Sequence, residues 1–395
     1  MSSISFSPSE TKLAYVAEGK EPEDNGPDAD PLSKFRFVPE LGETYGGKKR
    51  PAIFLYDWSR EVGQAVSPLA FAEVDAPRVL LAHPVFASDD KIIALGYEYS
   101  EDGRLLGIIY CPNRAASVWQ LSLPGDLSSM GQGVVRCASS KLTSSGIACR
   151  SPRILHHVGR TTLVFASNPV GGPHHSCSKV EVYEFEKSEL RTLVEIVHDP
   201  EPGAFPGLYT PSLPVYPFLH PSDKSEPFLA VSSVWRSRTT VLLISLTTGK
   251  VVDLTPDTKE HWSWTVLCTD GRSSVVCVRS ALNRPPEMVL GQVGADAHVS
   301  WRVFYMPTLS NDRTSVHFFA LYSWYATCPI SSTAKTRRSG RVSSPHSGSL
   351  PHRDHSGTVE NREISAVRHG APWRTAFREY NSVLRDVHEL CCRRL

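Results

Sequence analysis

The chain has 395 residues, of which 41% are hydrophobic and 21% are charged, so one large or two ordinary domains with a sizeable core are possible. Its 42 Lys and Arg residues against 41 Asp and Glu residues give no reason to expect a nucleic-acid or anionic-membrane partner. No apolar run approaches a membrane-spanning length, and the start MSSISFSPSE lacks the features of a secretory signal. We therefore expect a cytoplasmic protein.

The nine cysteines are an odd number and include no C-x-x-C pair. We expect most of them to be reduced thiols, several of which pack as small hydrophobic residues.

A loose internal repeat runs along most of the chain. A strand-like run ends in a turn of Ser, Pro, Asp and Gly residues, and a second apolar run follows at once, which predicts a β-hairpin. In chain order the predicted hairpins cover residues 5–17, 84–98, 154–167, 217–234 and 265–280.

A third apolar run follows several of these hairpins, at residues 51–59, 117–126, 179–189 and 240–255. The last is the clearest, because VLLISL, the turn Thr247-Thr248-Gly249 and VVDLT predict two strands joined tightly. Four short antiparallel strands per unit is the composition of a β-propeller blade.

A β-sandwich is the alternative, since it also has short strands and frequent turns. We favour an all-β fold with a partial β-propeller of about four to five blade-like units, because the units repeat in order and occupy too much sequence for one sandwich. Such units bury their faces against neighbours, so this number predicts an open arc.

Two regions depart from the repeat. Residues 19–50 are rich in Pro, Gly and acidic residues and then become basic, which predicts an exposed insertion within a region 1–303. Residues 304–395 turn to Ser, Arg and His, which predicts a low-complexity, mostly disordered tail with room for a short helix near residues 371–395.

Six blocks of the sequence are recognisable: SPSETKLAYVAE, RLLGIIYCPNRAASVWQLSL, SGIACRSPRIL, PHHSCSKVEVYEF, GLYTPSLPV and VWRSRTTVLLISLTTGKVVDLT. Together they resemble the N-terminal propeller region of acylaminoacyl-peptidase, also called acylamino-acid-releasing enzyme or acylpeptide hydrolase. This family belongs to the prolyl-oligopeptidase group of serine hydrolases. The resemblance covers roughly residues 1–303.

The resemblance implies a parent activity. Members pair the propeller with a C-terminal α/β-hydrolase domain, release an N-acylated amino acid from the N-terminus of short peptides, and are cytosolic and often tetrameric. The propeller would then act as a size filter for N-acylated peptides, and this chain would derive from such an enzyme.

The family's catalytic triad has no position to occupy in this chain. It needs a Ser on a G-x-S-x-G elbow, followed along the chain by an Asp and a His. The 395 residues contain no such string, and the nearest ones, at residues 271–274 and 340–343, lack the second glycine or the spacing. We therefore expect a truncated and inactive form, with no catalytic, cofactor-binding or metal-binding residues and no cofactor.

The stretch VGGPHHSC at residues 170–177 allows an oxyanion loop, a metal site or an ordinary turn. It follows one predicted strand and precedes another within a block that resembles propeller throughout. We interpret it as a connection in which Gly171, Gly172 and Pro173 shape the backbone, while His174, His175 and Cys177 are turn and packing residues.

Other histidines have weak arrangements for a metal. Strand alternation would send His156 and His157 to opposite faces, so that both cannot bind one ion. His346, His352 and His355 fall in the predicted tail, where no defined site is expected.

Three further strings have a structural and a functional interpretation. We favour core packing over a stacking platform for His261-Trp262-Ser263-Trp264. For Trp235-Arg236-Ser237-Arg238 we favour solvated surface charge over a channel rim that meets a peptide carboxylate or a neighbouring domain. For Lys335-Thr336-Arg337-Arg338 we favour a chance match over a localisation or nucleic-acid patch.

Three possibilities for the function follow from these expectations. The first is a non-catalytic, substrate-gating propeller of an acylaminoacyl-peptidase-like protein. The second is a binding module that docks a partner, either as a homo-oligomer or in an assembly with the intact enzyme. The third is a product that is too incomplete to fold and has no function. We expect no nucleic-acid or membrane partner in any of these cases.

Overall fold

The computed structural model describes residues 4–19, 35, 41–42, 45–58, 65–73, 78–107, 111–127, 130–131, 133–221, 226–256 and 261–306. Most of the predicted insertion at residues 19–50 lies outside the described residues, as does the predicted tail from residue 307 onward. The basic cluster at residues 335–338 and the histidines at 346, 352 and 355 fall there too. In the part that is described, no helix is long and apolar enough to cross a membrane.

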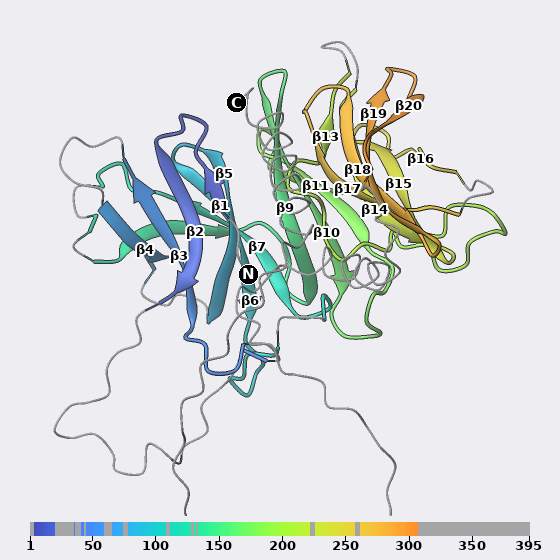
Figure 1. Cartoon of the computed structure of the whole chain (residues 1–395). Coiled ribbons are helices and arrows are strands. Elements are labelled where there is room, and N and C mark those ends of the chain that lie inside the picture. The colour runs from blue at the N-terminus through green and yellow to red at the C-terminus, as the bar shows by residue number, and fades with distance from the viewer. Residues whose placement is uncertain are drawn as a thin grey trace, which may run out of the picture. The chain divides into compact units, whose positions relative to one another are not determined.

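The strands fall into five consecutive groups of four (Figure 1). Group one contains β1 (Ile4–Phe6), β2 (Lys12–Glu18), β3 (Pro51–Asp57) and β4 (Ala65–Phe71). Group two contains β5 (Val79–Ser88), β6 (Lys91–Glu98), β7 (Ala116–Ser122) and β8 (Val135–Lys141). Group three contains β9 (Ile147–His157), β10 (Arg160–Pro169), β11 (Lys179–Glu184) and β12 (Glu189–Val194).

Group four contains β13 (Phe218–Leu219), β14 (Phe228–Trp235), β15 (Arg238–Ser245) and β16 (Val251–Asp253). Group five contains β17 (Ser263–Thr269), β18 (Ser274–Ala281), β19 (Arg284–Val293) and β20 (Val299–Tyr305). Within every group each strand pairs antiparallel with the next one along the chain. Each group is therefore a four-stranded unit of the kind that forms a propeller blade.

The predicted hairpins and the all-β class are confirmed. The five hairpins are β1–β2, β5–β6, β9–β10, β13–β14 and β17–β18, which open the five groups. The predicted four to five blade-like units are thus five. Two parallel contacts between groups were not predicted: β4 pairs with β8, and β7 touches β9.

The hydrophobic core lies between consecutive groups. Separate clusters of buried side chains join groups one and two, two and three, three and four, and four and five. Strand β15 shows how: Leu242 and Ile244 join the cluster shared with group three, whereas Val241 and Leu243 join the cluster shared with group five. Because alternate side chains point to opposite faces, both faces of β15 are buried. This two-sided burial explains the continuous apolar run in VLLIS.

Candidate functional site

The stretch at residues 170–177 connects β10 to β11, as the sequence predicted. Gly171 and Gly172 have positive φ angles of 81° and 77°, which suit glycine in a turn. Asn113, from the segment before β7, fixes this loop: its side-chain nitrogen donates to the carbonyl oxygens of Gly171 at 3.0 Å and Gly172 at 2.8 Å. The Gly171 amide in turn donates to the Asn113 carbonyl oxygen at 3.0 Å.

These three hydrogen bonds bring together two side chains that sequence analysis kept apart. The Cys111 sulfur lies 3.3 Å from Nε2 of His174. Cys177, in contrast, is buried, and a Cβ atom placed on Gly207 would lie 2.4 Å from its sulfur. His174 is thus a thiol partner as well as a turn residue, whereas Cys177 is a packing residue as expected.

A buried arginine lies at the joint between groups three and four. Arg150, on β9, donates to the carbonyl oxygens of Thr210 at 2.9 Å and Pro211 at 3.1 Å. It also donates to the side-chain oxygens of Asn168 and Ser178. Burial lowers the pKa of the Arg150 guanidinium to about 10, yet each of these bonds satisfies one of its donors.

Arg153 repeats this arrangement three residues further along β9. Its guanidinium donates to the carbonyl oxygens of Leu213, at 2.7 Å, and of Pro214. Burial lowers its pKa to about 10 as well. The two arginines, which we call the arginine clasp, hold residues 210–214, the segment that leads from β12 to β13. The clasp therefore joins two of the recognisable sequence blocks, SGIACRSPRIL and GLYTPSLPV.

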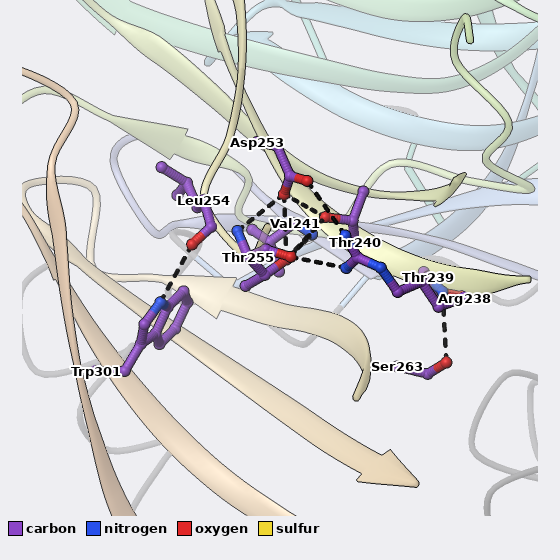
Figure 2. A network of polar contacts seen from close by, with 9 residues as sticks. All are labelled: Arg238, Thr239, Thr240, Val241, Asp253, Leu254, Thr255, Ser263 and Trp301. Atoms are coloured by element: carbon purple, nitrogen blue, oxygen red, sulfur yellow. Dashed lines mark hydrogen bonds and ion pairs between the residues drawn. The ribbon is translucent and has the colours of Figure 1, made fainter. Parts of the chain in front are cut away.

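A second polar network connects β15 to β16 and group four to group five (Figure 2). Arg238 donates to the Thr255 carbonyl oxygen at 2.7 Å and lies 3.5 Å from the Asp253 carboxylate. Asp253 accepts from the Thr240 hydroxyl and, at 2.8 Å, from the Thr255 amide. The arginine side chain is 12% exposed. The expectation of solvated surface charge is therefore wrong for Arg238, because its side chain is largely covered where it contacts Asp253 and Thr255, but correct for the exposed Arg236.

Two weaker bonds extend this network to group five. The Thr239 amide donates to the Ser263 hydroxyl at 3.4 Å, and the Trp301 indole donates to the Leu254 carbonyl oxygen at 3.4 Å (Figure 2). Group four is thus fixed by directional bonds to the groups before and after it.

The tryptophans of group five are packing residues, as predicted. Trp262 and Trp264 are 5% and 6% exposed and belong to the cluster between groups four and five. The Arg279 guanidinium lies 4.6 Å and 5.1 Å from their ring centroids. A base or sugar could not stack on rings that are covered in this way.

The histidine pair on β9 does not converge on one point. The His156 ring contacts the Thr161 hydroxyl at 3.2 Å, whereas the His157 ring lies 5.3 Å from the His220 ring. Within the described residues, no group of three or more His, Cys, Asp or Glu side chains could hold a metal ion.

One titratable residue was missed by the sequence interpretation. His83 lies on β5 with a positive φ of 51°, and its ring is 6.4 Å from the Tyr97 ring. Burial, with the positive charge of Arg153 nearby, lowers its pKa to about 4. Nothing in its sequence context, AHPVF, distinguishes it from an ordinary strand histidine.

Comparisons with known proteins find one matching family model and several relatives. A family model described as "Acylamino-acid-releasing enzyme, N-terminal domain" matches residues 1–311. Acylamino-acid-releasing enzyme 2 of Oryza sativa subsp. japonica is 27% identical over 324 residues, which cover 73% of this chain and 41% of the relative. The Mus musculus acylamino-acid-releasing enzyme is 26% identical over 321 residues, covering 75% and 41%. The chain thus spans about two fifths of the length of these curated relatives.

Solved structures give a weaker likeness. Prolyl oligopeptidase B from Galerina marginata has 11% sequence identity and a TM-score of 0.46, with 79% of this chain and 35% of that chain covered. The β-propeller domain of the trilobed protease from Pyrococcus furiosus has 8% identity and a TM-score of 0.36, with 73% and 65% covered.

Proposed function

Because the chain belongs to the acylamino-acid-releasing enzyme family, whose N-terminal domain it matches over residues 1–311, we propose that it is the non-catalytic, substrate-gating part of such an enzyme. In this proposal the enzyme to which such a part belongs releases an N-acylated amino acid from the N-terminus of short peptides. The observation that carries the proposal is the family match, which covers all five four-stranded groups.

The chemistry of the described side chains supports a scaffolding role. The arginine clasp and the network around Arg238 and Asp253 bind backbone carbonyl oxygens and one another at the joints between groups. Such bonds direct these arginine donors at acceptors within the chain. A framework of this kind suits the positioning of a separate catalytic domain.

Hydrolysis of a chromogenic acetyl-alanine substrate tests the non-catalytic part of the proposal. We expect the purified 395-residue chain to give no hydrolysis above the blank and no labelling by a fluorophosphonate, while the Mus musculus relative serves as the positive control. Hydrolysis that a fluorophosphonate abolishes would overturn the proposal.

A chimera tests gating. Residues 1–311 would replace the matching region of the Mus musculus relative, and fluorophosphonate labelling would show that the hydrolase part is folded. We expect the labelled chimera to cleave acetylated tripeptides and to reject a long acetylated peptide. Equal cleavage of both by a labelled chimera would refute gating.

A second candidate function is docking of the intact enzyme, which an aromatic sheet face in group one favours. Ala14, Ile53 and Leu55 bury one face of this sheet against group two. The opposite face carries rings in mutual contact, and we call it the aromatic face; its residues are Phe6, Tyr15, Phe54, Tyr56 and Trp58.

The exposure of the aromatic face sets it apart from the central sheets. Phe6 is 54% exposed and Trp58 is 36% exposed. Groups two, three and four each pack both faces against a neighbouring four-stranded group. The occupant that complements the aromatic face is therefore another sheet of this kind, which we assign to an intact enzyme of the same family.

Co-purification of the chain with a tagged intact relative tests docking. We expect Trp58→Ser to weaken the association, and Val158→Ser, at a 75% exposed position in the β9–β10 turn, to leave it unchanged. Association that Trp58→Ser leaves intact would place the interface elsewhere, and no association of the parent chain would refute docking.

A further inference from the structure

One thiol of the described chain has a basic partner and access to solvent. Cys111 is partly exposed, and its sulfur lies 3.3 Å from Nε2 and 3.8 Å from Nδ1 of the exposed His174. The pair is held in place by three hydrogen bonds between Asn113 and residues 171–172. Asn113 is 5% exposed, and its Oδ1 atom has no hydrogen-bond partner among the described residues. The thiol and the imidazole thus meet on a fixed loop.

A cavity of about 190 Å³ adjoins this loop. Val170 and Arg114 line this cavity. They are the chain neighbours of Gly171 and Asn113, which are hydrogen-bonded to each other. Tyr99 also lines the cavity. Two guanidinium groups lie over its ring, with the Arg50 Cζ atom 5.2 Å and the Arg78 Cζ atom 5.4 Å from the ring centroid.

Among the described residues that line this cavity, Arg114 is the cation. Glu98 also lines it, but its carboxylate is paired with the Lys141 ammonium at 2.8 Å. The described residues give Arg50, Arg78 and Arg114 no carboxylate partner within ion-pair distance. The positive charge of Arg114, three residues along the chain from Cys111, favours an anionic reactant over a neutral one at this thiol.

The other described cysteines lack these features. All five are buried, namely Cys137, Cys149, Cys177, Cys268 and Cys277. Burial raises the pKa of Cys137 and of Cys149 to about 12 and also raises that of Cys277, which disfavours their reactive thiolate forms.

We propose that Cys111 and His174 form a thiol-modification site that takes small, carboxylate-bearing disulfides of the glutathione disulfide type. His174 accepts the proton of the Cys111 thiol, and the thiolate attacks one sulfur of the disulfide. A new S–S bond forms to Cys111 while the original S–S bond breaks, and the departing thiolate takes up a proton. Cys111 is oxidised, the disulfide is reduced, and the site is independent of the gating and docking proposals.

The rate of mixed-disulfide formation with glutathione disulfide, followed by peptide mass mapping of the full chain, tests the site. Mapping assigns each adduct to its own cysteine, including the three at positions 328, 391 and 392 that lie outside the described residues. We expect Cys111 to be modified before the five buried cysteines. His174→Asn should slow its modification about tenfold because the proton acceptor is lost, whereas the matched variant His175→Asn should react at the parent rate.

A neutral disulfide separates charge recognition from general reactivity. Arg114→Gln should slow the reaction of Cys111 with glutathione disulfide about threefold and leave its reaction with bis(2-hydroxyethyl) disulfide unchanged. Equal slowing with both reagents would overturn the anionic preference. Equal Cys111 rates in the parent chain, His174→Asn and His175→Asn would overturn the site itself, as would modification of the buried cysteines before Cys111.

Discussion

Replacement of Arg150 by methionine should lower the free energy of unfolding by about 3 kcal/mol. The substitution keeps the apolar stem of the side chain but removes the donors that reach Thr210 and Pro211. The buried Thr210 carbonyl oxygen and the buried Asn168 Oδ1 atom would lose their donor. The Asn168 side chain cannot turn away, because its nitrogen donates to the Cys177 carbonyl oxygen at 2.6 Å. Pro211 is exposed, so water can replace the donor of its carbonyl oxygen.

The magnitude follows from those two buried acceptors, the Thr210 carbonyl oxygen and Asn168 Oδ1. An unsatisfied buried acceptor costs about 1–3 kcal/mol, so two cost about 2–6 kcal/mol. Burial of the Arg150 cation is itself unfavourable, as its lowered pKa shows, and the methionine variant avoids this unfavourable burial. The expected loss therefore lies at the lower end of that range.

Urea unfolding, followed by tryptophan fluorescence and by circular dichroism, measures this loss as a lower midpoint. Arg150→Lys should lose about 2 kcal/mol, because an ammonium group cannot reach acceptors spread around a planar guanidinium. The exposed Arg236→Met is the matched control and should change stability by less than about 0.5 kcal/mol. If Arg150→Met unfolds at the same midpoint as Arg236→Met, the clasp does not stabilise the joint and the reasoning is wrong.

Three further predictions concern single residues in the described groups. Asp253→Asn should cost about 2 kcal/mol in urea unfolding, because the carboxylate that accepts from the Thr240 hydroxyl and the Thr255 amide loses its charge; a loss below about 0.5 kcal/mol would contradict the network. For His83, whose pKa falls from 6.5 to about 4 on folding, the unfolded chain binds the proton first as the pH drops. Stability should therefore fall by up to about 3 kcal/mol between about pH 6.5 and pH 4, and His83→Asn should show a smaller fall across that window. Gly249→Ala should cost more than about 2 kcal/mol, because φ is 75° and the new Cβ would lie 2.3 Å from a backbone oxygen; Gly159→Ala, with φ 70° and open space, should cost only about 1 kcal/mol, and equal losses would show that the close approach is relieved.

The hairpins could be predicted from sequence because their signals are local. Each combines two apolar runs with a turn of two to several residues, and the turn at residues 247–249 joins β15 to β16 as expected. The fourth strand of several groups was harder to find. Strand β8 alternates between buried and exposed positions, and β12 begins with two exposed residues, so neither shows a continuous apolar run. Strand β4 contains Pro68, which argues against a strand in sequence analysis.

The candidate sites were predicted less well because they depend on contacts between distant segments. Arg150 and Arg153 reach carbonyl oxygens about sixty residues further along the chain, and Cys111 meets His174 across 63 residues. Carbonyl oxygens have no sequence signature, so no pattern could have marked residues 210–214 as acceptors. The loop at 170–177 was correctly placed between strands, but its partner Asn113 lies in a different block.

The two polar networks lie at joints where apolar packing alone leaves the geometry under-determined. Apolar contact is non-directional, so it specifies the relative position of two sheets less sharply than hydrogen bonds do. The arginine clasp is hydrogen-bonded to residues 210–214. Thr239 and Trp301 are hydrogen-bonded across the joint between groups four and five. Each of these bonds forms at only one relative position of the segments that it joins. The loss expected for Arg150→Met comes from acceptors left without a donor, and the same hydrogen bonds fix the position of the segment that accepts them. We therefore expect these networks to contribute both stability and register between neighbouring groups.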